Sequence, residues 1–197
     1  MTPRAPRTPR QRRPATMSDE AKAVGGILNI AVAAAIVYGV AHDNVTARLC
    51  VEYFTVGHPR VIASESPTAL ALVWGVLATW WFGALLGALL AIAARAGRRP
   101  KWGPRAVVKP IAALLVAVAT ASFIGGCLGY RHARMRDYPD WLSRLSLGPD
   151  AQFWFVVDLW AHRAAYLAGL VFTIALCALV AVRRWRAAPD AADTDNR

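Results

Sequence analysis

Four histidines are the side chains of this chain best suited to chemistry: His42, His58, His132 and His162. Asp158 precedes His162 by four residues, so the two share one face if the segment is helical. Neutral imidazole and carboxylate groups are common ligands of zinc and copper ions. We therefore take His42, His58, Asp158 and His162 as candidate ligands of a Zn or Cu ion, although no HExxH or CxxC motif accompanies them.

The same side chains also allow a structural interpretation without any metal. In that interpretation they form a hydrogen-bonded network that ties the segment 42–67 to the last helix, with Asp158 orienting His162. Neighbouring polar residues would complete an outer polar cap, namely Asp43, Arg48, Glu52 and Arg163. No G-x-S-x-G motif and no phosphate-binding glycine loop is present, so the sequence assigns no catalytic residue.

The cysteines leave two alternatives open. Cys50 and Cys127 are expected on the same side of the membrane, where an oxidising compartment would let them form a disulfide. Scattered cysteines more often serve as small apolar packing residues, and Cys177, which is expected near the other side, fits that role.

Four long apolar runs must position these side chains. They cover residues 23–41, 68–94, 110–130 and 164–182, and none contains a charged side chain. A helix needs about 20 apolar residues to cross the hydrocarbon core of a bilayer. The chain is 56% hydrophobic and only 18% charged, which excludes a disordered chain and argues against an ordinary soluble domain. The sequence predicts an all-α membrane protein with four transmembrane helices in a compact bundle.

Local signals indicate where the helices begin and how they pack. Ser66 and Pro67 are typical of an N-cap and a first turn, and Pro110 is expected in the first turn of the third helix. Small residues recur at every fourth position in all four runs, which lets helix backbones approach closely in lipid. Trp80 and Trp81 are expected to fill the gaps between these small-faced helices.

The basic residues predict an orientation. Of the 23 Lys and Arg residues, 16 lie in the N-terminal tail, the second loop and the C-terminal tail, and seven lie in or beside the other two loops. Together with the acidic residues, this leaves +11 on one side of the membrane and no net charge on the other. Because positive residues are retained in the cytoplasm, both termini are predicted to be cytoplasmic, and the charge needs no nucleic-acid partner to explain it.

This topology divides the chain into three parts. Residues 1–22 form a basic tail rich in Pro and Arg, which is predicted to be disordered, and translation is alternatively expected to start near Met17. Residues 23–185 form the transmembrane domain, with outer loops over 42–67 and 131–152. Residues 186–197 form a polar C-terminal tail.

The segment from His42 to Pro59 reads HDNVTARLCVEYFTVGHP. It resembles a recurring segment of a family of small bacterial multi-pass membrane proteins. The similarity continues through Trp80 and Trp81 to residues 94–101 and covers roughly residues 20–130. That family has no assigned activity. The resemblance therefore implies a bacterial integral inner-membrane protein that starts near Met17, and it transfers no functional residue.

Three functional hypotheses follow. The first is a non-enzymatic membrane component or subunit with a polar, periplasm-facing cap. The second is a periplasm-facing metal-binding protein or metal-dependent enzyme that uses the outer His and Asp residues. The third is a small oligomeric transporter, which the absence of ionisable groups from the apolar runs disfavours.

The expected partners are the lipid bilayer and the anionic lipid head groups at the cytoplasmic face. A second copy or another membrane protein is a further expectation, because Gly83 and Gly87 form a GxxxG match.

Overall fold

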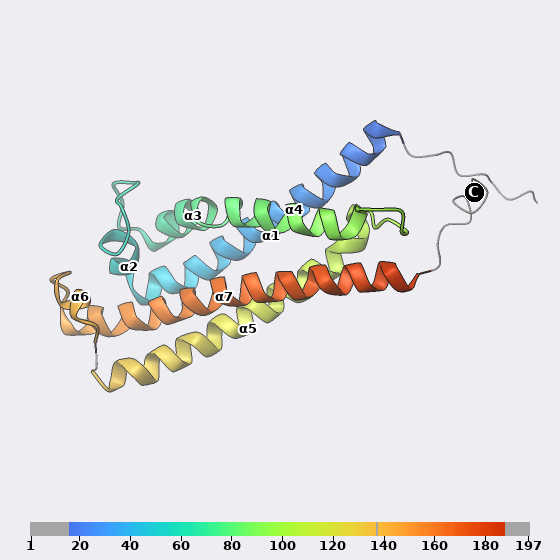
Figure 1. Ribbon diagram of the computed structural model, residues 1–197. Coiled ribbons are helices and arrows are strands. Elements are labelled where there is room, and N and C mark those ends of the chain that lie inside the picture. The colour runs from blue at the N-terminus through green and yellow to red at the C-terminus, as the bar shows by residue number, and fades with distance from the viewer. Residues whose placement is uncertain (1–15, 137, 188–197) are drawn as a thin grey trace, which may run out of the picture.

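The computed structural model describes residues 16–136 and 138–187. These residues form helices and no strand (Figure 1). The helices are α1 (Met17–Leu49), α2 (Val51–Thr55), α3 (Pro67–Leu77), α4 (Trp80–Arg95), α5 (Pro104–Arg134), α6 (Asp140–Ser143) and α7 (Pro149–Arg186). Most of the predicted N-terminal and C-terminal tails lies outside the described residues.

Four helical stretches in the described part of the chain are long and apolar enough to cross a membrane: Met17–Leu49, Pro67–Arg95, Pro104–Arg134 and Pro149–Arg186. The prediction of a four-helix, all-α membrane bundle is confirmed. The helices extend well beyond the apolar runs, so residues 42–49, which were expected in a loop, form the last two turns of α1. The 38 residues of α7 span about 57 Å, far more than the bilayer core.

The helices pack in two groups, which meet where α4 contacts α7 and where α1 contacts α5. α5 runs alongside α7, while α1 packs against α3 and α4, and α4 also contacts α7 (Figure 1). The repeated small residues lie at these contacts. A Cβ atom added to Gly75 of α3 would lie 2.5 Å from the backbone nitrogen of Val40 in α1, and one added to Gly39 would lie 2.6 Å from the carbonyl oxygen of Gly75. The two backbones therefore touch where each helix has no side chain.

The second membrane span is interrupted, which the sequence analysis did not predict. α3 ends at Leu77 and α4 begins at Trp80, and the Thr79 hydroxyl donates a hydrogen bond to the carbonyl oxygen of Gly75. The Tyr166 hydroxyl of α7 donates to the carbonyl oxygen of Ala78, 3.2 Å away. These two side chains satisfy backbone groups next to the interruption.

Two further expectations are wrong. Pro104, rather than Pro110, occupies the first turn of α5, and Pro110 lies inside the helix. Trp80 and Trp81 do not fill gaps in the bundle, because their side chains are 50% and 49% exposed. Large apolar side chains that face outward at mid-span meet lipid, so they need no partner within the protein.

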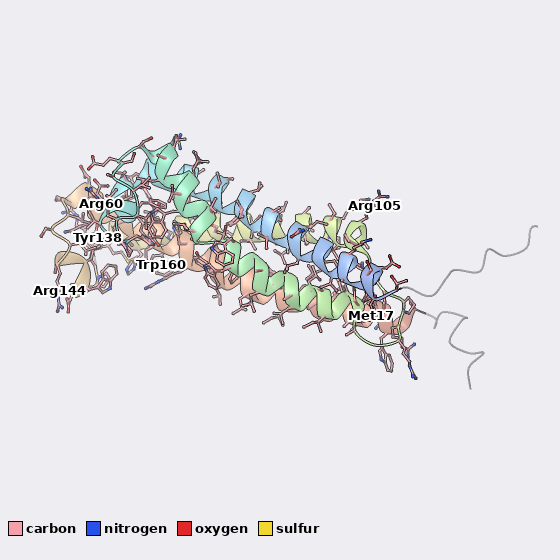
Figure 2. All side chains as sticks on the ribbon, turned by 90° about the horizontal axis from the view of Figure 1, so that it is seen from above. Met17, Arg60, Arg105, Tyr138, Arg144 and Trp160 are labelled. Atoms are coloured by element: carbon pink, nitrogen blue, oxygen red, sulfur yellow. The ribbon has the colours of Figure 1, made fainter. Side chains whose placement is uncertain are left out.

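The first described residues of α1 and the last turn of α7 lie at the same end of the bundle, which we call the terminal end. Figure 2 shows Met17 and Arg105 there, with Arg60, Tyr138 and Arg144 at the opposite end. Arg95 binds Glu20 of α1 through two nitrogens, 2.8 and 2.7 Å from the carboxylate oxygens. Arg184 is buried and donates to four backbone carbonyl groups: those of Ala93, Ala96, Arg99 and Pro100. It thereby caps the C-terminus of α4.

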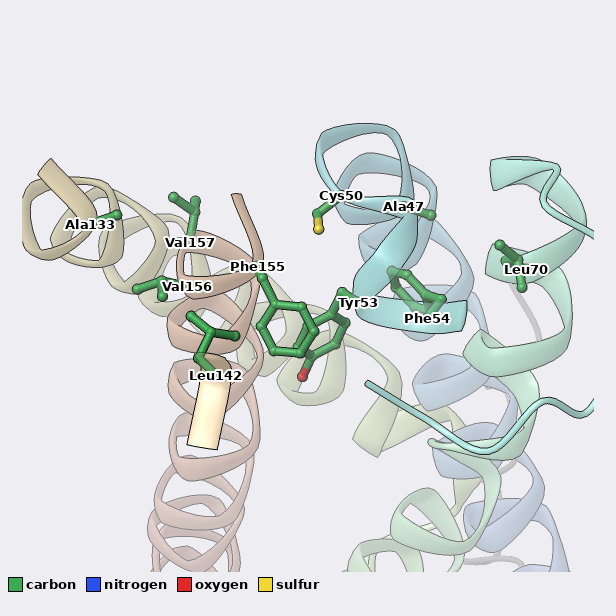
Figure 3. Close-up of a cluster of buried hydrophobic side chains, with 10 residues drawn as sticks. All are labelled: Ala47, Cys50, Tyr53, Phe54, Leu70, Ala133, Leu142, Phe155, Val156 and Val157. Atoms are coloured by element: carbon green, nitrogen blue, oxygen red, sulfur yellow. The ribbon is translucent and has the colours of Figure 1, made fainter. Parts of the chain in front are cut away.

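The opposite end, with α2 and α6, is called the histidine end. A buried apolar cluster fills it, in which Tyr53 and Phe54 of α2 lie opposite the last helix (Figure 3). The ring centroids of Tyr53 and Phe155 are 5.0 Å apart. This cluster holds α2 against α7 and fixes the position of the histidines just below it.

Candidate metal centre

α1 and α7 together position the candidate site. His42 and Asp43 lie on α1, directly after the apolar run, and His162 lies on α7 just before its apolar run. Asp43 is 5% exposed. α1 continues for six residues past Asp43, and α7 begins 13 residues before His162, so the site is built on helices rather than on a loop.

The three side chains converge on one carboxylate oxygen. His42 Nδ1 is 3.1 Å from Asp43 Oδ1, and His162 Nε2 is 3.4 Å from the same atom. One ligand atom from each of the three residues lies within 4.8 Å of the others. The two imidazole rings meet edge to face, with centroids 4.5 Å apart.

The hydrogen bonds on the far side of each ring fix where its proton lies. His162 Nδ1 is 2.8 Å from the carbonyl oxygen of Asp158, which can only accept, so Nδ1 carries the proton. His42 Nε2 is 2.9 Å from Ser122 Oγ, and the Ser122 hydroxyl donates to the carbonyl oxygen of Ala161 at 3.1 Å. When the Ser122 hydroxyl donates to Ala161, it accepts from His42, and Nε2 then carries the proton in that ring.

In the neutral rings, the other two nitrogens are consequently unprotonated. These are His42 Nδ1 and His162 Nε2, and both face the Asp43 carboxylate. Three atoms with lone pairs then face one another in a buried place, which is unfavourable unless a positive charge joins them. Two further protons would do so by making both rings cationic, and a single divalent cation would do so without charging either ring.

Aromatic side chains enclose the group on one side. The Tyr53 ring stacks on His162, with centroids 4.5 Å apart and an angle of 29° between the rings. Burial raises the pKa of the Tyr53 hydroxyl, so this side chain stays neutral over the physiological range.

A cavity of about 140 Å³ lies against the three residues and continues toward the middle of the bundle. It is lined mainly by apolar side chains, with Tyr53, Thr79 and Tyr166 among the polar ones. An ion held by three protein ligands keeps a coordination position for water or another ligand, and here the cavity provides room for it.

The structure brings together only two of the four residues proposed from sequence. His58 lies outside the group, where its Nδ1 is 2.7 Å from the carbonyl oxygen of Tyr53 and its ring packs on Trp74. The Asp158 side chain is also outside the group and is completely buried. Asp158 still orients His162, but through its backbone carbonyl group rather than its carboxylate.

The residues of the predicted polar cap have separate roles. Arg48 donates to Asn44 Oδ1 at 2.9 Å and to Thr68 Oγ1 at 2.8 Å, which ties α1 to α3. Glu52 lies 3.5 Å from the Cys50 sulfur, and Arg163 is exposed. Asp43 alone belongs to the converging group.

All three cysteines are free. Cys50 is buried beneath α2, Cys127 is exposed on α5 and Cys177 is partly buried on α7, so none of them is paired in a disulfide.

Sequence reasoning did not place Asp43 among the candidate ligands and did not identify Ser122 as the partner of His42. Asp43 was assigned to the cap because α1 was expected to end before it. The apolar residues Val45 and Leu49 continue the helical period past Asp43, and this signal would have extended α1. Ser122 is a single hydroxyl within an apolar run, and no spacing rule distinguishes it from a packing residue.

Comparisons with protein-family models, with curated proteins and with solved structures find no match for this chain.

Proposed function

We propose that this protein binds one divalent transition-metal ion inside the histidine end of its membrane bundle. The ligands are His42 Nδ1, Asp43 Oδ1 and His162 Nε2. The observation that carries the proposal is the convergence of His42 Nδ1, Asp43 Oδ1 and His162 Nε2, while the other nitrogen of each ring donates away from the group, to the Ser122 hydroxyl and to the Asp158 carbonyl oxygen.

The spacing of the atoms supports this proposal. Two ligand atoms about 2.0–2.1 Å from a tetrahedral ion are about 3.3 Å apart. The two nitrogen–oxygen distances in the group are 3.1 and 3.4 Å, and the three ligand atoms lie within 4.8 Å of one another, so the two rings must move closer together to bind one ion. Two imidazoles and one carboxylate suit zinc, and the same set with free positions also suits iron(II).

The hydrogen bonds to Ser122 and to the Asp158 carbonyl oxygen support it as well. Metal-bound histidines usually donate their second N–H to such a group, which fixes the orientation of the ring. Three protein ligands beside a cavity are typical of centres that bind water or substrate, whereas structural zinc sites have four. A metal-dependent activity therefore fits the site better than a purely structural ion.

The experiment is metal analysis of the protein purified in mild detergent and incubated with zinc or, anaerobically, with iron(II). We expect about one ion per chain. His162→Ala should lose it, because two ligands hold a divalent ion poorly. His58→Ala is the matched control, since His58 lies at the same end but outside the group, and it should keep the ion.

Less than about 0.1 ion per chain in the wild type, or equal loss in both variants, would contradict the proposal. The non-enzymatic membrane component predicted from the sequence would then be the better hypothesis.

We also propose that the protein lies in a bacterial inner membrane with both termini in the cytoplasm. The support is the concentration of basic residues in the segments at the terminal end, where Arg98, Arg99 and Arg105 of the second loop add to the basic residues of the two tail sequences. Anionic lipid head groups are the partners that this end would attract.

A further inference from the structure

A second, larger cavity opens between α1 and α5. It has a volume of about 780 Å³, and Val157, Asp158 and Ala161 of α7 form its floor. Several apolar side chains on its walls are exposed: Val45 at 61%, Leu49 at 41%, Phe123 at 74% and Tyr130 at 42%. Because these residues belong to helices that span the membrane, the groove opens toward lipid. Its volume lies in the range of about 300–1,000 Å³ that is usual for sites of small molecules.

The groove has the length of one lipid leaflet. Its wall on α5 runs from Ala119 to Arg131, which is thirteen residues, or about 18 Å along the helix. One leaflet contributes half of the hydrocarbon core, or about 15 Å. The length of the groove therefore matches that of an acyl chain in one leaflet.

The floor of the groove contains an unusual polar group. Asp158 lines the groove, its side chain is 0% exposed, and neither of its carboxyl oxygens has a hydrogen-bond partner among the described residues. Buried polar groups nearly always have a partner, since an unpaired one is costly. A ligand in the groove that offers an O–H or N–H group would supply it.

The order of chemical groups along the groove indicates which class of ligand it would bind. Trp160 of α7 contacts both Gly125 and Gly129 of α5, so Asp158 lies near the height of these glycines. Phe123 is therefore deeper in the membrane than Asp158, and the exposed Arg131 is nearer the histidine end. From the middle of the membrane toward the histidine end, the groove therefore has apolar walls around Phe123, then the Asp158 carboxyl group as a hydrogen-bond acceptor, and then the Arg131 cation.

We propose that this groove binds a single-chain lipid phosphate with a free hydroxyl or amino group between its chain and its phosphate. The chain lies along Phe123 and Val45, the hydroxyl or amino group donates to Asp158, and the phosphate meets Arg131. This goes beyond the proposed metal centre and does not depend on it, although His42 lies beside both.

The test is lipid titration of the detergent-purified protein, followed by native mass spectrometry. The probes are 1-oleoyl-lysophosphatidic acid, with a hydroxyl, and sphingosine 1-phosphate, with an amine and a hydroxyl. Oleyl phosphate has the chain and phosphate without either group. We expect one lipid per chain, and either of the first two should bind at least about tenfold more tightly than oleyl phosphate. Whichever binds best identifies the donor.

Variants assign the contacts. Asp158→Leu should abolish the preference over oleyl phosphate, Asp158→Asn keeps an acceptor and should retain it, and Arg131→Ala should weaken all three lipids. Val45→Trp should block the groove. It changes an exposed residue, so it tests the proposal even if Asp158→Leu does not fold. Val116→Trp is its control, because Val116 is 68% exposed on α5 outside the groove.

Equal affinity for lysophosphatidic acid, sphingosine 1-phosphate and oleyl phosphate would overturn the proposal, and so would unchanged binding in Val45→Trp. A dimer in detergent that Val45→Trp converts to a monomer would also overturn it, because a second copy would then occupy the groove. His162→Ala should keep lipid binding while losing metal, so the two proposals can fail separately.

Discussion

His42 and His162 each have one ring nitrogen tied to a group outside the site, and this determines what the other nitrogen can do. For His162 the tie is a backbone carbonyl group, which no side-chain substitution removes directly. For His42 it is the Ser122 hydroxyl, which can be removed. Ser122 therefore offers a test of the metal centre that changes no ligand.

Ser122→Ala should weaken zinc binding by about 10–100-fold, because His42 loses the acceptor that fixes its orientation and proton position. The measurement is a zinc titration against a competing chelator. Thr120→Ala is the control, since the Thr120 hydroxyl is exposed and bonds only to its own helix. If Ser122→Ala leaves the zinc affinity unchanged, the hydrogen bond between Ser122 and His42 has no influence on metal binding by that ring.

Cys50 provides a second prediction at this scale, because burial raises the pKa of its thiol from an ordinary 9.0 to about 12. At pH 8 its thiolate fraction should be about 1,000-fold lower than that of an ordinary thiol, and alkylation should be slower by at least that factor. The measurement is iodoacetamide labelling of a variant with Cys127→Ala and Cys177→Ala, compared with the same protein unfolded in SDS.

The direction of the pH dependence follows. The folded state keeps the Cys50 proton that the unfolded chain loses, so between about pH 9 and pH 12 rising pH favours unfolding. Labelling of the folded protein at pH 8 within about tenfold of the unfolded rate would contradict the burial of this thiol.

The residues of the site were only partly predictable. His42 and His162 were identifiable because imidazoles are rare in this chain and both flank apolar runs. His58 has the same chemistry and a similar position in sequence, yet the fold of α2 turns it toward the Tyr53 carbonyl group. The local sequence does not predict this orientation of His58, because it depends on the packing of Tyr53 against α7.

At the scale of helices, contact between backbones holds α1 to α3 and α4. Gly39 and Gly75 oppose each other, and Gly83 approaches Ala35 in the next turns. Each of these positions excludes a side chain. The stability of the bundle should therefore depend on glycines that face another helix and not on those that face lipid or water.

Gly75→Ala should lower stability by about 1–3 kcal/mol, since its Cβ atom would push the α1 backbone away. Gly25→Ala is the matched control, because nothing lies within 4 Å of its Cβ position. That control should be neutral or slightly stabilising, as alanine favours helix. Thermal unfolding in detergent measures both, and equal midpoints for the two variants would show that the close contact is not needed.

The number of membrane spans was predictable, because a long uncharged apolar run in a chain of this composition favours a transmembrane helix. The interruption between Leu77 and Trp80 was not, since Ala78 and Thr79 are unremarkable in an apolar run. It is accompanied by Tyr166 of α7, a partner 88 residues away in sequence. Pro110 likewise indicated a helix start, but Pro104 offers the same signal one and a half turns earlier.

At the scale of the whole molecule, α1 enters and α7 leaves at the same end, so an even number of crossings connects them (Figure 2). Basic side chains gather there, including Arg95, Lys101 and Arg184, which bind Glu20 or backbone carbonyl groups. Orientation is thus a property of the complete chain rather than of any helix.

A fluorescent protein fused after Arg186 should fold and fluoresce, because the positive-inside rule places this end in the cytoplasm. Alkaline phosphatase inserted after Arg60, at the histidine end, should be active, since it folds only outside. Exchanging the two reporters provides the control and should silence both. Active phosphatase after Arg186 would reverse the proposed topology.

Tyr38 and His42 line both the cavity beside the histidines and the groove between α1 and α5. They lie one turn apart on α1, so the two spaces are separated by side chains on a single face of this helix. Tyr38→Ala would remove half of that partition and join volumes of about 140 and 780 Å³ into a continuous passage. In its native form, the chain therefore keeps two mainly apolar spaces apart, and the Tyr38 and His42 side chains of α1 lie between them.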